Sequence, residues 1–253
     1  RFRSMHPSNT TNPKICVVGL GYIGLPTASL LATKGFAVHG VDTRADVVET
    51  INAGKIHIVE PELDVLVRSA VHSGQLRAAT EPEPADVFII AVPTPFKEGH
   101  APDLSYVEAA SRKVAQHVAP GNLVILESTS PVGTTERVAQ WILEERRDLE
   151  GGSIRVAHCP ERVLPGRILH ELVANDRIVG GIDDASTDAA ADFYRRFVSG
   201  EVLTTDARTA ELAKLTENTY RDATIAPANA PSLACAHPPA HVCRLLAPAH
   251  PPP

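Results

Sequence analysis

The feature that most constrains this chain is a glycine-rich turn near its start, Gly19 to Gly24 (GLGYIG). A short apolar run, residues 15–18, leads into it, and an apolar stretch with helical character, residues 23–33, follows. In a G-x-G-x-x-G turn the first glycine permits the tight bend, the second leaves room for a pyrophosphate, and the third lets helix and strand pack closely. The pattern therefore predicts a strand, a turn that binds phosphates, and a helix whose N-terminus attracts them.

An acidic residue stands at the expected distance from this turn. Asp42 ends the apolar run 36–41, a predicted second strand, about twenty residues after the glycines. A carboxylate there binds the ribose hydroxyls of NAD and repels the 2′-phosphate of NADP, although Arg44 nearby would soften that preference. The residues predict an NAD site. The alternative is a ligand-free turn in which Asp42 caps a helix.

Strand-like and helix-like segments alternate as far as residue 203. Continuous apolar runs at 87–92 and 123–126 predict strands that are buried on both faces of a parallel sheet. Shorter strand signals lie at 154–157, 177–179 and 202–203, and helical patterns at 47–52, 104–118 and 134–147. The alternation predicts an α/β fold, namely a doubly wound, mostly parallel Rossmann sheet with helices on both faces.

The pattern changes after residue 206. Residues 209–222 predict a long helix with no strand behind it, and from Pro227 onward the prolines are too dense for a packed helix. We expect four regions in the chain. They are a disordered tail (1–13), an NAD-binding Rossmann domain (14–205), the start of an α-helical dimerisation domain (206–226) and an aberrant proline-rich tail (227–253).

Composition narrows the choice of partners and compartment. The net charge of −6 lacks the basic character of nucleic-acid binders, and no apolar run approaches the ~20 residues of a membrane span. The start of the chain lacks the apolar core of a signal peptide. Four cysteines are too few for a disulfide scaffold of this length, which indicates a reducing compartment. We expect a cytoplasmic protein that binds neither nucleic acid nor membranes.

Five motifs then occur in order along the chain: Gly19–Pro26 (GLGYIGLP), Ala91–Phe96 (AVPTPF), Glu127–Thr134 (ESTSPVGT), Cys159–Gly166 (CPERVLPG) and Leu212–Asp222 (LAKLTENTYRD). Together they resemble the UDP-glucose/GDP-mannose dehydrogenase family, and the last two look most like its UDP-N-acetyl-D-mannosamine branch. The resemblance implies oxidation of UDP-N-acetyl-D-mannosamine at C6 to the uronate by two hydride transfers to NAD. Another UDP-sugar, such as UDP-glucose or UDP-N-acetylglucosamine, is the alternative substrate.

The resemblance also assigns cofactor contacts. Thr94 and Thr129, each of which follows a buried strand, would touch NAD, and Thr129 would also orient a catalytic water. From the residues alone, Thr94 belongs to a stiff turn between two prolines and Thr129 to a helix cap. The expected cofactor contacts are Gly19, Gly21, Tyr22, Ile23, Gly24, Asp42, Thr94 and Thr129.

The CPERVLPG motif would carry chemistry and substrate contacts. The resemblance implies that Glu161 assists proton transfer or water activation, and that Arg162 and the Val163 backbone contact the substrate. The alternative is a surface Glu–Arg pair of little energetic weight. Cys159 precedes a proline at a strand end and is interpreted as a packing residue. Many UDP-glucose-type relatives carry a second glutamate where Pro165 stands, so its absence favours the mannosamine branch.

Three polar residues of the last motif share one helix face. Lys214, Asn218 and Arg221 are spaced i, i+4 and i+7. Lys214 and Asn218 suit stabilisation of an alkoxide that develops at C6, and Arg221 suits a hold on the sugar or a phosphate. The alternative is a solvated polar face. The family match favours the functional interpretation.

The chain ends before the glycine-rich segment that carries the family's nucleophilic cysteine. We therefore expect the chain to bind NAD weakly or not at all and to turn over no sugar nucleotide, whereas the full-length parent would be a homodimer. Two other hypotheses belong to different classes of protein. One is a non-catalytic NAD sensor, and the other is a zinc module built from Cys235, His237, His241 and Cys243.

Overall fold

The structure is a computed structural model that describes residues 12–97, 99, 101–149 and 151–234. The chain divides into two units, one that ends at Leu212 and one that begins at Ala213. The first elements are β1 (Ile15–Val18), α1 (Gly24–Thr33), β2 (Val38–Val41), α2 (Ala45–Asn52), α3 (Leu63–His72), β3 (Leu76–Ala79), β4 (Val87–Ile90) and α4 (Ser105–Ala115). The later ones are β5 (Leu123–Leu126), α5 (Thr134–Glu145), β6 (Arg155–His158), α6 (Ile168–Ala174), β7 (Arg177–Gly181), α7 (Asp184–Tyr194), β8 (Val202–Asp206) and α8 (Ala207–Ala234).

In the described part of the chain, eight strands form one sheet in the order β3-β2-β1-β4-β5-β6-β7-β8. Neighbouring strands are parallel except for β6 and β7, which pair antiparallel through Ala157 with Gly181 and His158 with Gly180. The expected doubly wound, mostly parallel Rossmann sheet is confirmed. The strand order reverses between β1 and β4, and a sheet of this kind binds ligands at the carboxyl ends of the strands beside such a reversal.

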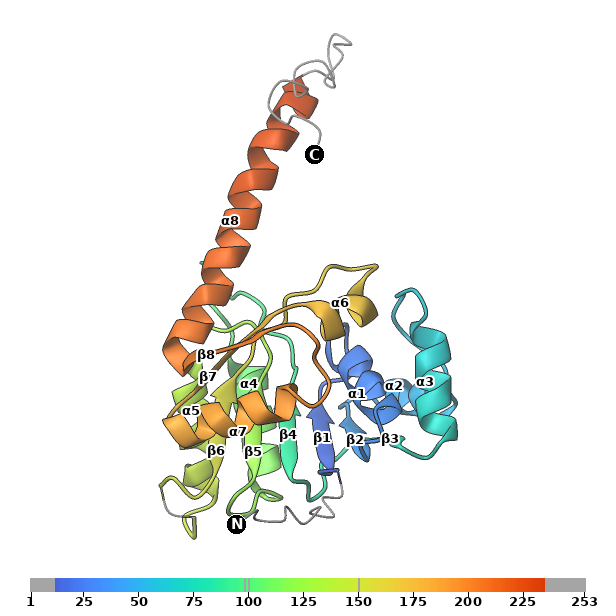
Figure 1. Cartoon of the computed structure of the whole chain (residues 1–253), viewed down its shortest axis with the longest axis vertical. Helices are drawn as coiled ribbons and strands as arrows, with labels where there is room; N and C mark the ends of the chain where they lie inside the picture. Colours follow the sequence, from blue (N-terminus) through green and yellow to red (C-terminus); the bar gives the residue numbers. More distant parts are fainter. Residues whose placement is uncertain (1–11, 98, 100, 150, 235–253) are drawn as a thin grey trace, which may run out of the picture. The chain divides into compact units, whose positions relative to one another are not determined.

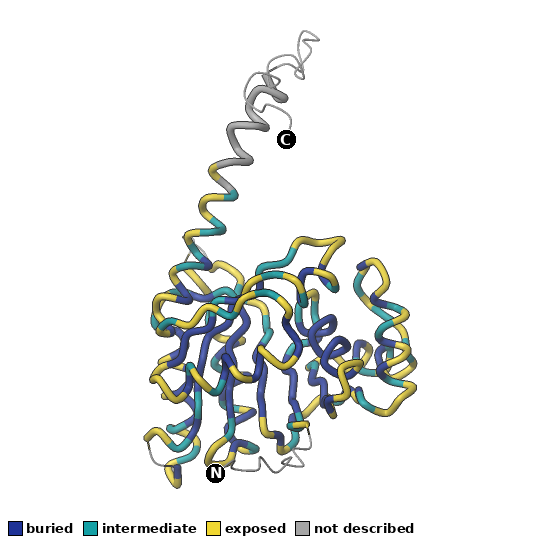
Figure 2. The backbone as a smooth tube through the Cα atoms, viewed as in Figure 1, coloured by how far each residue is buried: buried dark blue, intermediate teal, exposed yellow. Residues whose placement is uncertain are grey.

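Side chains of the central strands alternate between two hydrophobic cores, one on each face of the sheet. Along β1, Ile15 and Val17 point into the core that α1, α3 and α7 cover. Cys16 and Val18 point into the opposite core, which α4 and α5 cover. The central strands are buried along their whole length, whereas many of the connections between elements are exposed (Figures 1 and 2). Continuous apolar runs were the correct signal for these strands because both of their faces are covered.

Four elements have no counterpart among the segments expected from the sequence: α3, β3, α6 and α7. The edge strand β3 alternates between buried and exposed residues and is only four residues long. Helix α6 has seven residues, and α7 (DASTDAAADFY) is rich in small and acidic residues. Each of these segments offers a short or weak apolar pattern, so its structure depends on contacts with the rest of the domain.

The expectation that the prolines from Pro227 onward exclude a helix is wrong as far as Ala234. Helix α8 continues to that residue and includes Pro227 and Pro231. A proline removes one intrahelical N–H···O bond, and these two stand four residues apart, so the missing bonds fall on one side of the helix. The rest of the expected proline-rich tail, 235–253, lies outside the described residues. No helix in the described part of the chain is long and apolar enough to cross a membrane.

Candidate active site

The glycine turn joins β1 to α1, and its backbone geometry explains why glycine is needed twice. Gly19 has a φ of 92°, in the left-handed region that favours glycine. At Gly24 a Cβ would stand 1.7 Å from the carbonyl oxygen of Gly19, so only a hydrogen fits there. At Gly21 a Cβ would meet nothing within 4 Å. The space beside Gly21 is therefore open, as the approach of a pyrophosphate to the backbone requires.

Asp42 lies at the end of β2 and reaches back to the glycine turn. Its Oδ2 accepts a hydrogen bond from the backbone N–H of Leu20 at 3.1 Å, and its Oδ1 accepts one from the N–H of Arg44 at 3.0 Å. These bonds fix the carboxylate while leaving lone pairs for ribose hydroxyls. The guanidinium of Arg44 forms an ion pair with Asp46. Arg44 is the residue near Asp42 that the sequence suggested could bind a 2′-phosphate, and in the structure its charge is paired with Asp46.

A cleft of about 610 Å³ opens beside the turn, at the carboxyl ends of β1, β2 and β4. Its lining includes five of the eight predicted cofactor residues, namely Gly19, Gly21, Tyr22, Ile23 and Asp42, whereas Gly24, Thr94 and Thr129 do not line it. Helix α4 supplies further lining residues that the sequence did not indicate: Tyr106, Ala109, Ala110 and Lys113. No local motif marks these positions, because they line the cleft only through the place of α4 in the fold.

Thr94 and Thr129, predicted on separate motifs, lie together. The Thr94 hydroxyl donates to the backbone carbonyl of Thr129 at 2.7 Å, and the Ser128 hydroxyl donates to the carbonyl of Val92 at 2.7 Å. These bonds tie the loop after β4 to the loop after β5. The two threonines therefore lie on one rigid wall beyond the carboxyl ends of neighbouring strands.

Glu161 follows β6 and is 6% exposed. Its Oε2 accepts a hydrogen bond from Arg177 Nη1 at 2.6 Å in a buried ion pair, and its Oε1 accepts one from the backbone N–H of Arg162 at 2.6 Å. The alternative of a surface Glu–Arg pair is wrong, because the arginine partner is Arg177 of β7, at 1% exposure. Burial opposes the charge of Arg177, yet Glu161 and the other acidic groups nearby raise its pKa overall.

A second buried carboxyl group, that of Glu127, lies near this ion pair. Glu127, which follows β5 and is 2% exposed, accepts a hydrogen bond from the Tyr194 hydroxyl at 2.8 Å. The ring of Tyr194 in turn lies 5.5 Å from the Arg177 guanidinium carbon. We call Glu127, Glu161, Arg177 and Tyr194 the buried charge cluster. Burial and the negative charge of Glu161 raise the pKa of Glu127 to about 7, against the opposing effects of Arg177 and the Tyr194 bond.

This raised pKa predicts a loss of stability as the pH rises. An unfolded glutamate has an ordinary pKa of 4.5, so between about pH 4.5 and 7 the folded state binds the proton more strongly. The contribution of Glu127 to the free energy of unfolding is therefore fully present below pH 4.5. This contribution, about 3 kcal/mol, is lost as the pH rises from 4.5 through 7. Glu127→Gln, which keeps an acceptor for Tyr194, should flatten this part of the stability profile in urea unfolding. An unchanged slope would contradict the assignment.

Cys159 is fully buried in the core between these groups. Burial raises the pKa of its thiol to about 12, so the thiol stays protonated at neutral pH. Because the thiolate is the nucleophilic form of cysteine, a protonated buried thiol is unsuited to attack a substrate. The geometry agrees with the interpretation of Cys159 as a packing residue.

The predicted substrate residues Arg162 and Val163 lie on the loop between β6 and α6. Both are partly exposed, and the Asn175 side chain donates to the Arg162 carbonyl at 2.8 Å. Lys214, Asn218 and Arg221 lie on α8 beyond Leu212, in the second unit of the chain. Within the first unit, the cleft and the loops after β4, β5 and β6 lie along one edge of the sheet.

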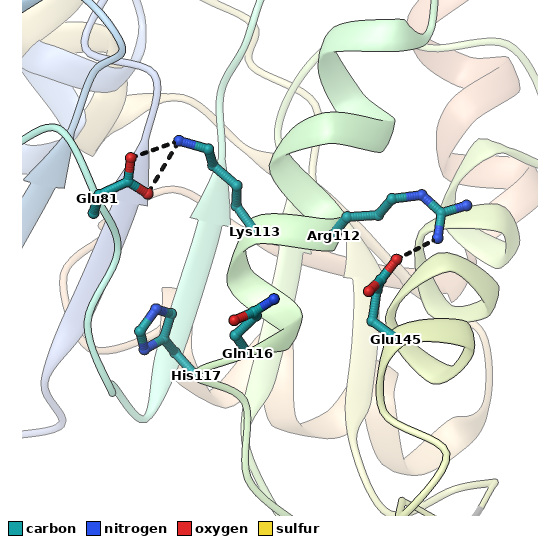
Figure 3. Close-up of a pocket in the computed structure, with 6 residues that line it drawn as sticks. All are labelled: Glu81, Arg112, Lys113, Gln116, His117 and Glu145. Atoms are coloured by element: carbon teal, nitrogen blue, oxygen red, sulfur yellow. Dashed lines mark hydrogen bonds and ion pairs between the residues drawn. The ribbon is translucent and has the colours of Figure 1, made fainter.

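A smaller hollow of about 290 Å³ shares Lys113 with the cleft but contains no residue of the predicted site (Figure 3). Lys113 pairs with Glu81 at 2.9 Å, and Arg112 pairs with Glu145 at 2.8 Å. These pairs link α4 to its neighbours and satisfy the charges that line the hollow. Among the described residues no group of three or more His, Cys, Asp or Glu side chains is arranged to hold a metal. The hypothetical zinc ligands, Cys235, His237, His241 and Cys243, lie outside the described residues.

The strand order, the glycine turn and the acid at the end of β2 define a dinucleotide-binding Rossmann domain. Residues 13–198 match the profile of the NAD-binding domain of the UDP-glucose/GDP-mannose dehydrogenase family. The chain belongs to this family.

Two curated relatives illustrate the similarity. The NDP-N-acetyl-D-galactosaminuronic acid dehydrogenase of Ralstonia nicotianae is 58% identical over 87% of this chain and 54% of its own length. The UDP-N-acetyl-D-mannosamine dehydrogenase of Campylobacter jejuni is 56% identical over 88% of this chain and 56% of its own length. The chain thus spans about half the length of these relatives.

Solved structures agree with this assignment. A UDP-D-ManNAc dehydrogenase from Pyrococcus horikoshii superposes with a TM-score of 0.87 at 45% identity, covering 94% of this chain and 58% of that protein. The UDP-N-acetyl-mannosamine dehydrogenase Cap5O from Staphylococcus aureus gives a TM-score of 0.84 at 43% identity, with 94% and 59% covered. The resemblance stated from the five sequence motifs is confirmed at family level and in its nearest branch.

Proposed function

We propose that this chain is the NAD-binding half of a dehydrogenase that oxidises the C6 alcohol of UDP-N-acetyl-D-mannosamine to the carboxylate. The observation that supports this most is the continuous edge formed by the cleft at Gly21 and Asp42, the paired threonines after β4 and β5, and Glu161 after β6. Cofactor and reacting alcohol would meet along this edge. The relatives that bear the name of this activity are similar over nearly all of the chain.

The residues fit the cofactor. Open space at Gly21 accommodates the pyrophosphate, the free N–H groups at the start of α1 attract it, and Asp42 accepts hydrogen bonds from ribose hydroxyls. The bound nicotinamide supplies a hydride acceptor for each of two oxidations. Overall, one alcohol, two NAD+ and one water give one carboxylate, two NADH and three protons.

The remaining roles follow from chemistry at C6. We propose that Lys214 and Asn218 stabilise the alkoxide as its proton leaves, and that Arg221, Arg162 and the Val163 backbone hold the sugar nucleotide. Thr129 would orient the water that completes the second oxidation. Glu161 would assist proton transfer, with the orientation of its carboxylate set by Arg177.

A hybrid enzyme tests the reaction. Residues 12–226 of this chain would replace the matching half of the Campylobacter jejuni relative, and NADH would be counted per sugar nucleotide consumed. Two NADH per UDP-N-acetyl-D-mannosamine, with formation of the uronate, supports the proposal. Lys214→Ala in the same hybrid should lower kcat by about a thousandfold, roughly 4 kcal/mol. No oxidation of any UDP-sugar by a folded hybrid would overturn it.

A second candidate substrate has its own support. A relative at 58% identity bears the name of an N-acetyl-D-galactosaminuronic acid dehydrogenase, so the galacto configuration is the main competitor. Comparing kcat/KM of the hybrid for UDP-N-acetyl-D-mannosamine, UDP-N-acetyl-D-galactosamine and UDP-glucose distinguishes them. A higher value for either competitor would reassign the substrate while leaving the reaction class unchanged.

Cofactor preference can be measured on this chain directly, since every residue that lines the cleft lies between Val18 and Lys113. We expect NAD to bind at least about tenfold more tightly than NADP, a difference of about 1.4 kcal/mol, because Asp42 repels the 2′-phosphate. Titration calorimetry with both cofactors measures the ratio of their dissociation constants. It also tests whether the chain binds NAD only weakly, as the sequence suggests. Asp42→Ser should reduce the preference, and tighter binding of NADP by the parent chain would contradict it.

We also propose that the complete protein is a homodimer whose interface includes α8. Helix α8 follows the residues that match the NAD-binding domain profile, 13–198, and the relatives continue well beyond the matched half. Analytical ultracentrifugation of the hybrid checks this proposal. A monomer at micromolar concentration would contradict it.

A further inference from the structure

The loop between β6 and α6 carries the residues proposed to meet the sugar nucleotide. Leu164, Pro165, Gly166 and Arg167 are all exposed, so the loop has little core of its own. Some of its anchors come from nearby in the sequence. Glu171 accepts a hydrogen bond from the backbone N–H of Leu164 at 2.8 Å, and Asn175 donates to the Arg162 carbonyl.

Another anchor comes from a distant part of the chain. Glu60 lies in the connection between α2 and α3, more than 100 residues away, and is only 5% exposed. Its Oε2 accepts from the N–H of Gly166 at 2.8 Å, and its Oε1 accepts from the N–H of Ile168 at 2.8 Å. Both oxygens of a buried carboxylate are thus committed to backbone donors of one loop. Charge-assisted bonds of this kind are stronger than neutral ones.

The topology explains how Glu60 reaches this loop. Only three residues separate the end of helix α3 from the start of β3, so the C-terminus of α3 lies near the amino end of that strand. The start of α3, just after Glu60, therefore lies toward the carboxyl ends of the strands, where the loop after β6 also lies. Figure 1 shows the connection before α3 and helix α6 at the same edge of the sheet.

The contact specifies one shape of the loop. Gly166 has a φ of 87°, a conformation that only glycine adopts readily, and the Glu60 bonds hold the N–H groups on either side of Arg167. Helix α6 has no side-chain cap of its own at Arg167, so Glu60 supplies the acceptor at its first residue. Glu60 does not line the cofactor cleft. Its effect should therefore fall on the loop and not on NAD.

We propose that Glu60 is a positioning residue that fixes the β6–α6 loop in the shape that receives the sugar nucleotide. The second half of this inference, that the ordered loop receives the sugar nucleotide, rests on the proposed function. The first half, that Glu60 orders the loop, concerns the described chain itself. The two halves need separate measurements.

Limited trypsin digestion of this chain tests the first half. The loop offers two cleavage sites, after Arg162 and after Arg167. Glu60→Gln keeps the size of the side chain but presents an amide N–H₂ to one of the two backbone donors, so cleavage at these sites should accelerate about tenfold. Glu62→Gln, an exposed glutamate of the same connection, is the matched control and should leave the rate unchanged. Equal rates in parent and Glu60→Gln would overturn the inference.

Controls separate a loosened loop from general unfolding. NAD affinity and the thermal midpoint are measured for each variant, and Glu60→Asp keeps the charge on a shorter stem in case the glutamine variant does not fold. Acceleration confined to Arg162 and Arg167 in a variant with parental NAD affinity supports the inference. Acceleration at all tryptic sites together would attribute the effect to fold stability and overturn it.

The hybrid enzyme tests the second half. Glu60→Gln should raise KM for the sugar nucleotide about tenfold while kcat changes less than threefold and KM for NAD stays the same, with Glu60→Asp in between. An unchanged sugar KM in a variant with a loosened loop would overturn the link to substrate. An inactive parent hybrid would count against the proposed function alone, because the proteolysis result does not depend on catalysis.

Discussion

Arg177→Met is expected to destabilise the first unit by about 3–5 kcal/mol at neutral pH. Arg177 is 1% exposed and forms the buried ion pair with Glu161, so methionine would leave that carboxylate in the core without its cation. The Arg177 charge also lowers the pKa of Glu127, and its loss would push that pKa higher still. Urea unfolding at about pH 7 and about pH 5 measures the effect, which should shrink at the lower pH because Glu127, whose pKa is raised, is then protonated and carries no charge.

Two comparisons decide whether the cost arises from an unpaired charge. The double variant Arg177→Met with Glu161→Gln should recover part of the loss, because the remaining group is polar but neutral. Arg195→Met is the surface control. Both side chains of its ion pair with Asp192 are more than half exposed, so the pair should contribute less than about 1 kcal/mol. A double variant as unstable as the single one would show that packing, and not charge, dominates.

The second large effect concerns two glycines of the same turn. Gly21→Ala should leave the domain as stable as the parent, because a Cβ there meets nothing within 4 Å. NAD affinity should nevertheless fall about 10- to 100-fold, or about 1.4–2.8 kcal/mol, because the methyl group occupies the space of the pyrophosphate. Thermal unfolding and NAD titration of the same sample separate the two properties.

Gly24→Ala should instead lower the stability of the domain itself. Its Cβ would stand 1.7 Å from the Gly19 carbonyl oxygen, so α1 must move away from β1 and stability should fall by about 3 kcal/mol before any ligand is added. If Gly21→Ala destabilised the domain as much as Gly24→Ala does, the open space beside Gly21 would not be a ligand site. Parental NAD affinity in Gly21→Ala would lead to the same conclusion.

How much the sequence predicts depends on how local the signal is. The glycine turn, the acid after β2 and the doubly buried strands were predictable because spacing and apolar runs encode them within about 30 residues. The partner of Glu161 was not, since Arg177 reaches it only through the pairing of β6 with β7. Glu60 was equally hidden, because it resembles an ordinary loop glutamate until the fold brings it to Gly166.

Motifs alone also mislead about depth. One alternative for CPERVLPG was a surface Glu–Arg pair, yet Glu161 lies in the interior and only the later residues of the motif reach solvent. Glu127 begins the motif ESTSPVGT, in which Thr129 was the predicted functional residue, but the glutamate is the group with the strongly altered pKa. Burial of this kind comes from packing between layers, which a linear pattern does not contain.

The antiparallel direction of β7 affects which charged residues can lie at the edge of the sheet where the site is found. Parallel strands present only their last residues and the loops that follow, so every group there would normally come from a strand's end. Because β7 runs opposite to β6, with His158 beside Gly180, its first residue, Arg177, comes to lie across from Glu161. The inverted direction of β7, which β8 shares, thus brings the beginning of a strand to the edge where β6 and the strands before it end. It places a fixed cation there without lengthening any loop.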